Sequence, residues 1–229
     1  MLLRTFYFLS LLSCSTLIFA ESKQKTIIEL DEYIITASRS EQKLMESSPS
    51  VSLWKKEDLD NYILSNISDF LWLEAGNFII PNGGIGKSTS LFTRGSESNH
   101  TSILLNGRRL PSGFSGQHDL GLLNFVNIGA TEYVRGDSSS LYAGALGGVI
   151  NLRSLTPKIN ILKKVNEEIE IQYGSNSYEN INYGYTFNDS DIIFSSGIEH
   201  LVSDGFQYNS DFKRLSHNLY FDYKLNDFL

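Results

Sequence analysis

The sequence predicts a small α+β domain, with a mixed sheet and short helices, followed by a run of antiparallel strands. Segments of helical character and short β-rich runs share residues 51–154, where glycines are dense at the expected turns. From about residue 166 the hydrophobic pattern changes and repeats every second residue. The chain is therefore expected to divide into a helix-and-strand part and a strand-only part.

Two helices and three strands are expected in the first part. Lys56–Asn61 and Ile67–Glu74 have helical character, and Ser68 is a candidate cap for the second helix. Glycine clusters mark places where the chain must turn or pass close to another backbone. The β-rich runs, bounded by glycines or turn residues, are Ile103–Asn106, Glu132–Val134 and Val149–Leu152.

The strand-only part contains four segments in which apolar and polar residues alternate. Tyr, Phe and Ile dominate one face, and polar turns separate the segments. Such strands form either a soluble antiparallel sheet with one buried face or the wall of a membrane barrel whose apolar face meets lipid. Periodicity alone leaves both interpretations open. The segments centre on residues 169–173, 181–187, 192–198 and 219–225.

The first 20 residues predict export. Met1–Arg4 is a short basic start, and the apolar stretch after it is too short and too broken to span a bilayer comfortably. Cleavage after Ala20 makes residues 1–20 a signal peptide; the alternative is a lipoprotein processing site at Cys14. Cys14 is the single cysteine, so the mature chain is predicted to have neither a disulfide nor a zinc–cysteine site.

Three motifs in the middle of the chain form an ordered series. They are Thr93-Arg94-Gly95, the segment ILLNGRRL that begins at Ile103, and the segment YVRGDSSSLYAGALGGVINL that begins at Tyr133. This series resembles the plug domain of TonB-dependent outer-membrane receptors. Asn106 and Asp137 stand where that family usually has Asp and Pro, and we expect these departures to change details of the plug only.

The resemblance implies a fold for each part of the chain. Residues 51–154 form the plug domain, and residues 155–229 form about four antiparallel strands of an incomplete transmembrane β-barrel. Four strands cannot close a barrel, because an open sheet edge in lipid leaves backbone groups without partners. We therefore expect the chain to be the N-terminal portion of a longer receptor, from a truncated gene or a partial sequence.

The apolar island within the polar segment 21–50 is similar to the TonB box of these receptors. The family uses this box to engage TonB, which is coupled to the inner-membrane proton-motive force. A strand in a mobile periplasmic tail can add itself to a partner sheet; the alternative is that the island is the first strand of the plug sheet. The predicted TonB contacts are Glu32, Tyr33, Ile34, Ile35, Thr36 and Ala37.

The resemblance also assigns residues within the plug. Arginine forks at two Arg-Gly pairs are expected to anchor the plug to carboxylates of the barrel wall. The anchoring candidates are Arg94, Gly95, Arg135, Gly136, Tyr142, Gly147 and Gly148. The candidates for substrate contact lie in two apical loops and are Asn82, Gly83, Gly84, Lys87, Ser88, Ser112, Phe114, Gln117 and His118.

Other motifs do not support a catalytic interpretation. Residues 81–88 nearly match a phosphate-binding P-loop, but Pro81 replaces the first glycine and lacks an N–H for the phosphate cradle. The four histidines have no metal-ligand spacing, and neither a nucleophile elbow nor a carboxylate pair stands out. We therefore predict no enzyme activity, no cofactor and no metal site. The net charge of −7 argues against nucleic acid as a partner.

The expected function is energy-coupled uptake of a scarce ligand across the outer membrane. The partners are then TonB, outer-membrane lipid around the barrel and an extracellular ligand. A ferric siderophore is the commonest ligand in the family, and cobalamin, haem and glycans are the alternatives. An exported soluble module for binding or adhesion is the competing class, and it predicts a folded product that needs no detergent.

Overall fold

The computed structural model describes residues 33–36, 39–40, 42–43, 45, 50–62, 64, 66–136, 140–155, 164–189 and 191–223. The predicted signal peptide, residues 1–20, lies outside this part of the chain. Among the described helices, none is long and apolar enough to cross a membrane. The strands form one five-stranded mixed sheet, one four-stranded sheet and two short strand pairs.

The five-stranded mixed sheet organises residues 50–155, which we call the mixed-sheet domain. The order across the sheet is β3–β8–β9–β6–β7, in which β6 and β9 are parallel and all other neighbours are antiparallel. Three of these strands contain the predicted β-rich runs, except that β6 ends one residue before the predicted Asn106, which has a positive φ of 51°; β3 and β7 were not predicted. The strands span Ser50–Lys55 (β3), Thr101–Leu105 (β6), Arg108–Arg109 (β7), Ile128–Arg135 (β8) and Gly148–Ser154 (β9).

Short helices and a strand pair complete the domain. Helix α2 spans Lys56–Leu59 and α3 spans Ile67–Leu73, so both predicted helices are confirmed. Strands β4 and β5 pair around the glycine-rich loop of residues 82–88. The remaining elements are β4 (Asn77–Pro81), β5 (Thr89–Thr93) and the 3-10 turns η2 (Ser98–His100) and η3 (Leu120–Leu122).

The cap of α3 differs from the sequence prediction. Asn66, not Ser68, stands at the N-cap: the Asn66 side-chain oxygen accepts from Asp69 N–H at 3.1 Å. The Asp69 carboxylate in turn accepts from Asn66 N–H at 3.1 Å, which completes a reciprocal capping box. Ser68 lies inside the first turn, where it is buried.

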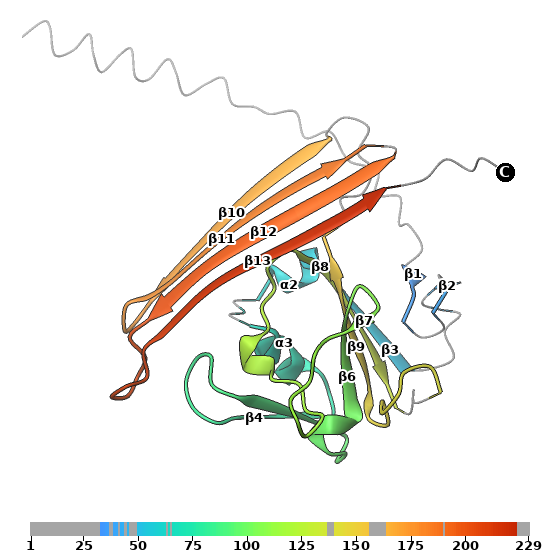
Figure 1. Ribbon diagram of the computed structural model, residues 1–229, viewed down its shortest axis with the longest axis horizontal. Helices are drawn as coiled ribbons and strands as arrows, with labels where there is room; N and C mark the ends of the chain where they lie inside the picture. Colours follow the sequence, from blue (N-terminus) through green and yellow to red (C-terminus); the bar gives the residue numbers. More distant parts are fainter. Residues whose placement is uncertain are drawn as a thin grey trace, which may run out of the picture. The chain divides into compact units, whose positions relative to one another are not determined.

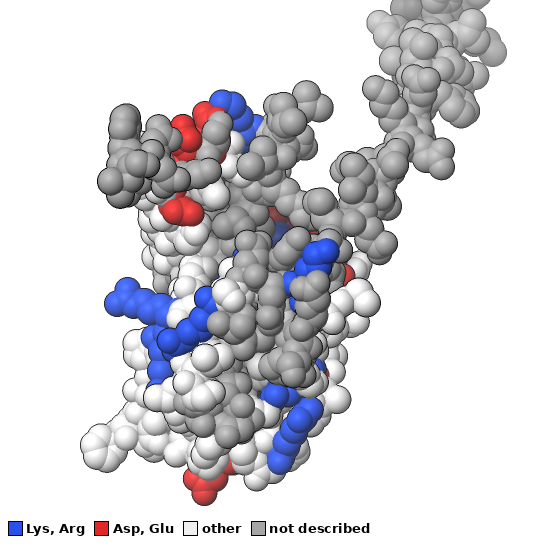
Figure 2. All heavy atoms as spheres, turned by 90° about the vertical axis from the view of Figure 1, so that its right-hand side faces the viewer, with Lys and Arg blue, Asp and Glu red and all other residues white. Residues whose placement is uncertain are grey.

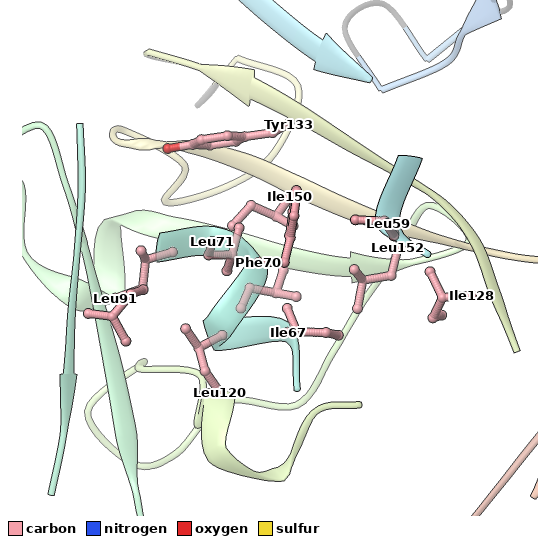
Figure 3. Packing of buried hydrophobic residues seen from close by; sticks show 12 residues of the cluster. Leu59, Ile67, Phe70, Leu71, Leu91, Leu120, Ile128, Tyr133, Ile150 and Leu152 are labelled. Carbon is pink, nitrogen blue, oxygen red and sulfur yellow. The ribbon is translucent and has the colours of Figure 1, made fainter. Parts of the chain in front are cut away.

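One face of the mixed sheet packs against α3 to form the main core. Figure 3 shows Ile67, Phe70 and Leu71 of α3 beside Tyr133 and Ile150 of the sheet. Burying each such side chain contributes about 1.5–3 kcal/mol. The opposite face carries a second, smaller cluster whose buried members are Leu104, Val134, Tyr142, Ala145 and Val149.

Residues 165–223 form a separate four-stranded antiparallel sheet (Figure 1). Consecutive strands pair without register shifts, so the predicted period-two segments are confirmed as strands. The two faces differ: the polar face includes buried Asn180, Thr186 and Glu199, whereas Ile169 and Phe221 are exposed on the other face. The strands span Val165–Gly174 (β10), Tyr178–Asn188 (β11), Ile192–Ser203 (β12) and Phe212–Tyr223 (β13).

Candidate functional site

The N-terminal segment that the sequence predicted as a free strand is docked on the mixed-sheet domain. Among the described residues, strand β1, Tyr33–Ile34, pairs only with the two-residue strand β2, Gln42–Lys43. Ile34 and Thr36 are buried, and Ile35 between them is 37% exposed. β1 is not part of the five-stranded sheet. The other predicted TonB contacts, Glu32 and Ala37, lie outside the described residues.

A buried carboxylate of the mixed sheet holds this segment. Glu132 of β8 accepts hydrogen bonds at Oε2 from Ile35 N–H at 3.1 Å, Thr36 N–H at 2.8 Å and the Thr36 hydroxyl at 2.5 Å. Its Oε1 accepts from Arg153 Nη1 at 2.8 Å, and the Glu132 side chain is 0% exposed. Glu132 lies on the same face as Val134, because side chains two residues apart in a strand share a face.

Two further side chains fix Thr36. Asn151, the cross-strand neighbour of Glu132, donates from Nδ2 to the Thr36 hydroxyl at 2.9 Å. Tyr142 donates its hydroxyl to the Thr36 carbonyl oxygen at 3.1 Å, and burial raises the pKa of Tyr142. The Arg39 guanidinium lies 4.7 Å from the centre of the Tyr142 ring and donates to the Leu141 carbonyl oxygen. Figure 2 views the molecule from the right-hand side of Figure 1, where β1 and β2 lie, and shows Lys and Arg side chains on this face.

The first predicted substrate loop, residues 82–88, is a compact exposed turn. Asn82 N–H donates to the Ser88 carbonyl oxygen at 2.9 Å, and Lys87 N–H donates to that of Gly84 at 3.1 Å. All five predicted substrate residues of this loop are exposed: Asn82, Gly83, Gly84, Lys87 and Ser88.

In the second predicted substrate loop, three of the predicted residues are exposed and one is buried. Ser112, Phe114 and Gln117 are exposed, and Phe114 at the tip is fully so. His118 is 6% exposed: its Nε2 accepts from Ile103 N–H at 3.4 Å, and its Nδ1 lies 3.2 Å from the Pro111 carbonyl oxygen. Burial lowers the pKa of His118. His118 therefore positions the loop rather than projecting from it.

The first loop touches the four-stranded sheet at one end. Gly86 has φ +75°, and the Phe212 ring of β13 occupies the space that a side chain at Gly86 would need. Phe212 follows directly after the connection between β12 and β13. That connection carries two exposed aromatic side chains, Phe206 and Tyr208. The loop of residues 82–88 therefore lies against the start of β13, close in sequence to these two aromatic residues.

The predicted anchoring arginines have different environments. Arg135 pairs with Glu74, donates to Ser52 Oγ at 2.6 Å and lies 4.8 Å from the centre of the Tyr133 ring. Glu74 belongs to the mixed-sheet domain, so Arg135 anchors the domain internally and not to the four-stranded sheet. Arg94 is exposed, with φ +49°, and its N–H donates to the Gly76 carbonyl oxygen at 2.7 Å.

The predicted glycines allow close approach of backbone segments. A Cβ at Gly148, which has φ +140°, would lie 2.5 Å from the Val134 carbonyl oxygen. A Cβ at Gly147 would lie 2.6 Å from Ser96 Oγ. Gly95 and Gly136 have positive φ but open surroundings.

The residues that join the mixed-sheet domain to the four-stranded sheet were not predicted from the sequence. Glu199 of β12 accepts from Arg214 Nε at 2.7 Å and Nη2 at 3.0 Å, and from Asn124 Nδ2 at 2.9 Å. Asn218 Nδ2 donates to the Val126 carbonyl oxygen at 2.7 Å. The alternation of β12 puts Glu199 on the polar face, which is the only sequence signal for this contact.

A cavity of about 340 Å³ lies beside this contact, between α2, residues 125–128 and strands β10–β12. Lys56 of α2 lines the cavity, where its Nζ lies 3.0 Å from Glu168 Oε1 of β10 and 2.8 Å from Asp60 Oδ1. Burial opposes the charge of Lys56, yet its pKa is raised because both carboxylates accept hydrogen bonds from it. Asn180, Asn182 and Glu199 complete a polar lining that suits water or a small polar solute.

Comparison with known proteins identifies the mixed-sheet domain. The family model described as the TonB-dependent Receptor Plug Domain matches residues 43–149. Among solved structures, the siderophore receptor PiuA from Acinetobacter baumannii has a TM-score of 0.61 and 18% sequence identity; the match covers 82% of this chain and 26% of PiuA.

Two more solved structures have the same fold. The ferripyoverdine receptor of the outer membrane of Pseudomonas aeruginosa has a TM-score of 0.63 and 18% identity, with 75% of this chain and 22% of the receptor covered. The copper transporter OprC has a TM-score of 0.65 and 16% identity; the match covers 79% of this chain and 29% of OprC. At these identities the likeness shows the fold, and the chain spans roughly a quarter of the length of these proteins.

Proposed function

Because residues 43–149 of this chain are a TonB-dependent receptor plug domain, we propose that the chain serves energy-coupled uptake of a scarce extracellular ligand, above all a ferric siderophore. In this proposal the mixed-sheet domain is the plug, and strands β10–β13 are part of the barrel wall in the outer membrane. The polar face of the wall meets the plug, and the apolar face meets lipid. The plug and the N-terminal segment face the periplasm.

The observation that carries the proposal is the way the N-terminal segment is held. Residues 33–36 have high β propensity, yet they pair with only two residues and otherwise depend on side chains of the plug. A strand held in this way is released by breaking a few hydrogen bonds and exposing the Ile34 side chain, without opening the five-stranded sheet. Once released, it can pair with the edge of a TonB sheet. Glu32–Ala37 are therefore the proposed TonB contacts.

The exposed loops support the other half of the proposal. Residues 82–88 and the tip around Phe114 are accessible at the surface, and Gly86 packs against Phe212 of β13. Phe206 and Tyr208 are exposed in the connection that precedes β13. Aromatic side chains and backbone groups in such loops supply contacts for a large organic ligand. Ligand binding there is proposed to favour release of the N-terminal segment.

A proline substitution tests the role of the segment. Proline at position 34 removes an N–H and restricts φ, whereas valine keeps both the N–H and the β propensity. In isolated outer membranes, we expect Ile34→Pro to abolish cross-linking of the receptor to TonB and Ile34→Val to retain it. Unchanged cross-linking in Ile34→Pro would refute the proposed role of the segment.

The ligand is tested by uptake of radiolabelled ferric siderophores by cells that express the protein from its own gene. Copper ions are the comparison, because one of the similar structures is a copper transporter. Uptake of iron that requires both TonB and an intact Ile34 supports the proposal. Uptake of copper alone would reject a siderophore as the ligand.

A further inference from the structure

The sequence contains two Asn-Gly pairs, Asn82-Gly83 and Asn106-Gly107. In such a pair the glycine nitrogen can attack the side-chain carbonyl carbon of the asparagine, because glycine has no side chain to hinder the approach. A cyclic imide forms and ammonia leaves, so asparagine is a chemically labile residue. Which of the two pairs reacts depends on how the fold holds each of them.

The fold holds Asn106-Gly107 in the turn between β6 and β7. The two residues have φ of +51° and +77°, as in a two-residue hairpin turn. Asn106 Nδ2 donates to Ser154 Oγ at 2.9 Å, and its Oδ1 accepts from Ser154 N–H at 2.8 Å. Gly107 N–H donates to Asn151 Oδ1 at 2.9 Å. Strand β9 therefore engages both reacting groups, and they cannot meet unless these hydrogen bonds break.

The pair Asn82-Gly83 is held much less tightly, in the loop of residues 82–88. Asn82 N–H donates to the Ser88 carbonyl oxygen at 2.9 Å. Among the described residues, neither the Asn82 side chain nor Gly83 N–H has a hydrogen-bond partner. Asn82 and Gly83 are exposed, and Gly84, the next residue, has open space around it. The two reacting groups of this pair are therefore free to meet.

We propose that Asn82 is a site of spontaneous modification, at which the loop of residues 82–88 loses ammonia and acquires a carboxylate. The Gly83 nitrogen gives up its proton, bonds to Asn82 Cγ and displaces the side-chain nitrogen, which leaves as ammonia. Water then opens the cyclic imide at either carbonyl group, which gives aspartate or isoaspartate at position 82. The overall change consumes one water molecule and releases one ammonia, and it needs no enzyme and no oxidant.

The products change both the charge and the backbone of the loop. Lys87 is the only charged residue among residues 82–88, so a carboxylate at position 82 cancels the charge of the loop. Isoaspartate also lengthens the backbone by one carbon atom, which disturbs the hydrogen bond from Asn82 N–H to Ser88. An effect on ligand binding rests on the proposed function of this loop, whereas the modification itself does not.

Peptide mass spectrometry of the receptor, expressed from its own gene and purified in detergent, tests the proposal. The folded receptor is incubated at mildly alkaline pH, and the increase of acid at positions 82 and 106 is followed over time. We expect conversion at Asn106 to be about 100-fold slower than at Asn82, because three hydrogen bonds must open first. The rate at Asn82 should rise with hydroxide concentration, since the attacking nitrogen must lose its proton, and isoaspartate should appear among the products.

Two controls separate the effect of the fold from that of the sequence. In the receptor unfolded in urea, the contacts of both pairs are lost, so the rates at Asn82 and Asn106 should become similar. Asn82→Gln should stop conversion at position 82, because its longer side chain would have to close a larger ring, and it should leave the rate at Asn106 unchanged.

The outcomes decide the proposal without reference to TonB or to a ligand. Similar rates at Asn82 and Asn106 in the folded receptor would overturn it, because the fold would then not select the site. Conversion of Asn82 in urea but not in the folded receptor would also overturn it, because the loop would then protect the pair. Since no uptake is measured, this proposal can fail while the proposed function stands, and the proposed function can fail while Asn82 still converts.

Discussion

Replacing Glu199 by Gln tests how the plug is held against the wall. The Glu199 carboxylate is nearly fully buried and accepts two hydrogen bonds from Arg214 and one from Asn124 of the plug. Glutamine keeps the shape but replaces one acceptor oxygen by an NH₂ group that faces other donors. Arg214 then keeps a buried charge without a counter-ion. Removing one partner of a buried ion pair costs about 3–5 kcal/mol.

Limited proteolysis of outer membranes measures this effect at residues 119–127. If the contact loses about 3 kcal/mol of stabilisation, the population in which residues 119–127 are released from the four-stranded sheet increases about 100-fold. The cleavage rate follows that population when reclosing is fast. His200→Gln, on the other face of β12, is the matched control and should be cleaved at the natural rate. Replacing both Glu199 by Leu and Arg214 by Met removes both charges and should restore most of the protection. Natural cleavage rates in Glu199→Gln would refute the reasoning.

Two further predictions concern the plug itself. Burial lowers the pKa of His118, so its neutral ring stabilises the fold fully above about pH 6.5, and this contribution is lost as the pH falls through the lowered pKa. The urea midpoint of unfolding should therefore fall between about pH 7 and pH 5. In His118→Gln the midpoint should fall less over the same range. Gly148→Ala places a Cβ 2.5 Å from the Val134 carbonyl oxygen at φ +140° and should lower the free energy of unfolding by about 2 kcal/mol or more, whereas Gly84→Ala, with open space around it, should leave the unfolding midpoint unchanged.

The wall strands could be predicted because their two faces meet different surroundings. Along β11, polar Asn180 and Thr186 face the plug, whereas Tyr183 on the opposite face is exposed. Because successive side chains of a strand point to opposite faces, this contrast appears in the sequence as an alternation of polar and apolar residues. The helix α3 was predictable for a similar reason, since its apolar side chains recur at helical spacing. Its cap was not: Ser68 and Asn66 are both good capping residues, and only the backbone conformation distinguishes them.

The docking of the N-terminal segment could not be predicted from sequence alone. Thr36 and Glu132 are 96 residues apart, and no local pattern relates them. The prediction of a free strand followed from the polar composition around the segment, which does not report contacts made at a distance. One signal was present: Glu132 shares a face of β8 with Val134, and a carboxylate on an otherwise apolar face needs a partner.

The kinds of contact that hold the plug predict how it moves. Within the plug, α3 packs on the mixed sheet through apolar side chains, whereas the plug meets the wall largely through hydrogen bonds such as those of Asn124 and Asn218. Hydrogen bonds exchange for water at about 0.5–1.5 kcal/mol each, less than the burial of one large apolar side chain. The plug should therefore separate from the wall as a body before its core opens. In Glu199→Gln, cleavage should concentrate at residues 119–127 and spare β8 and β9; equal cleavage in these strands would contradict this order of events.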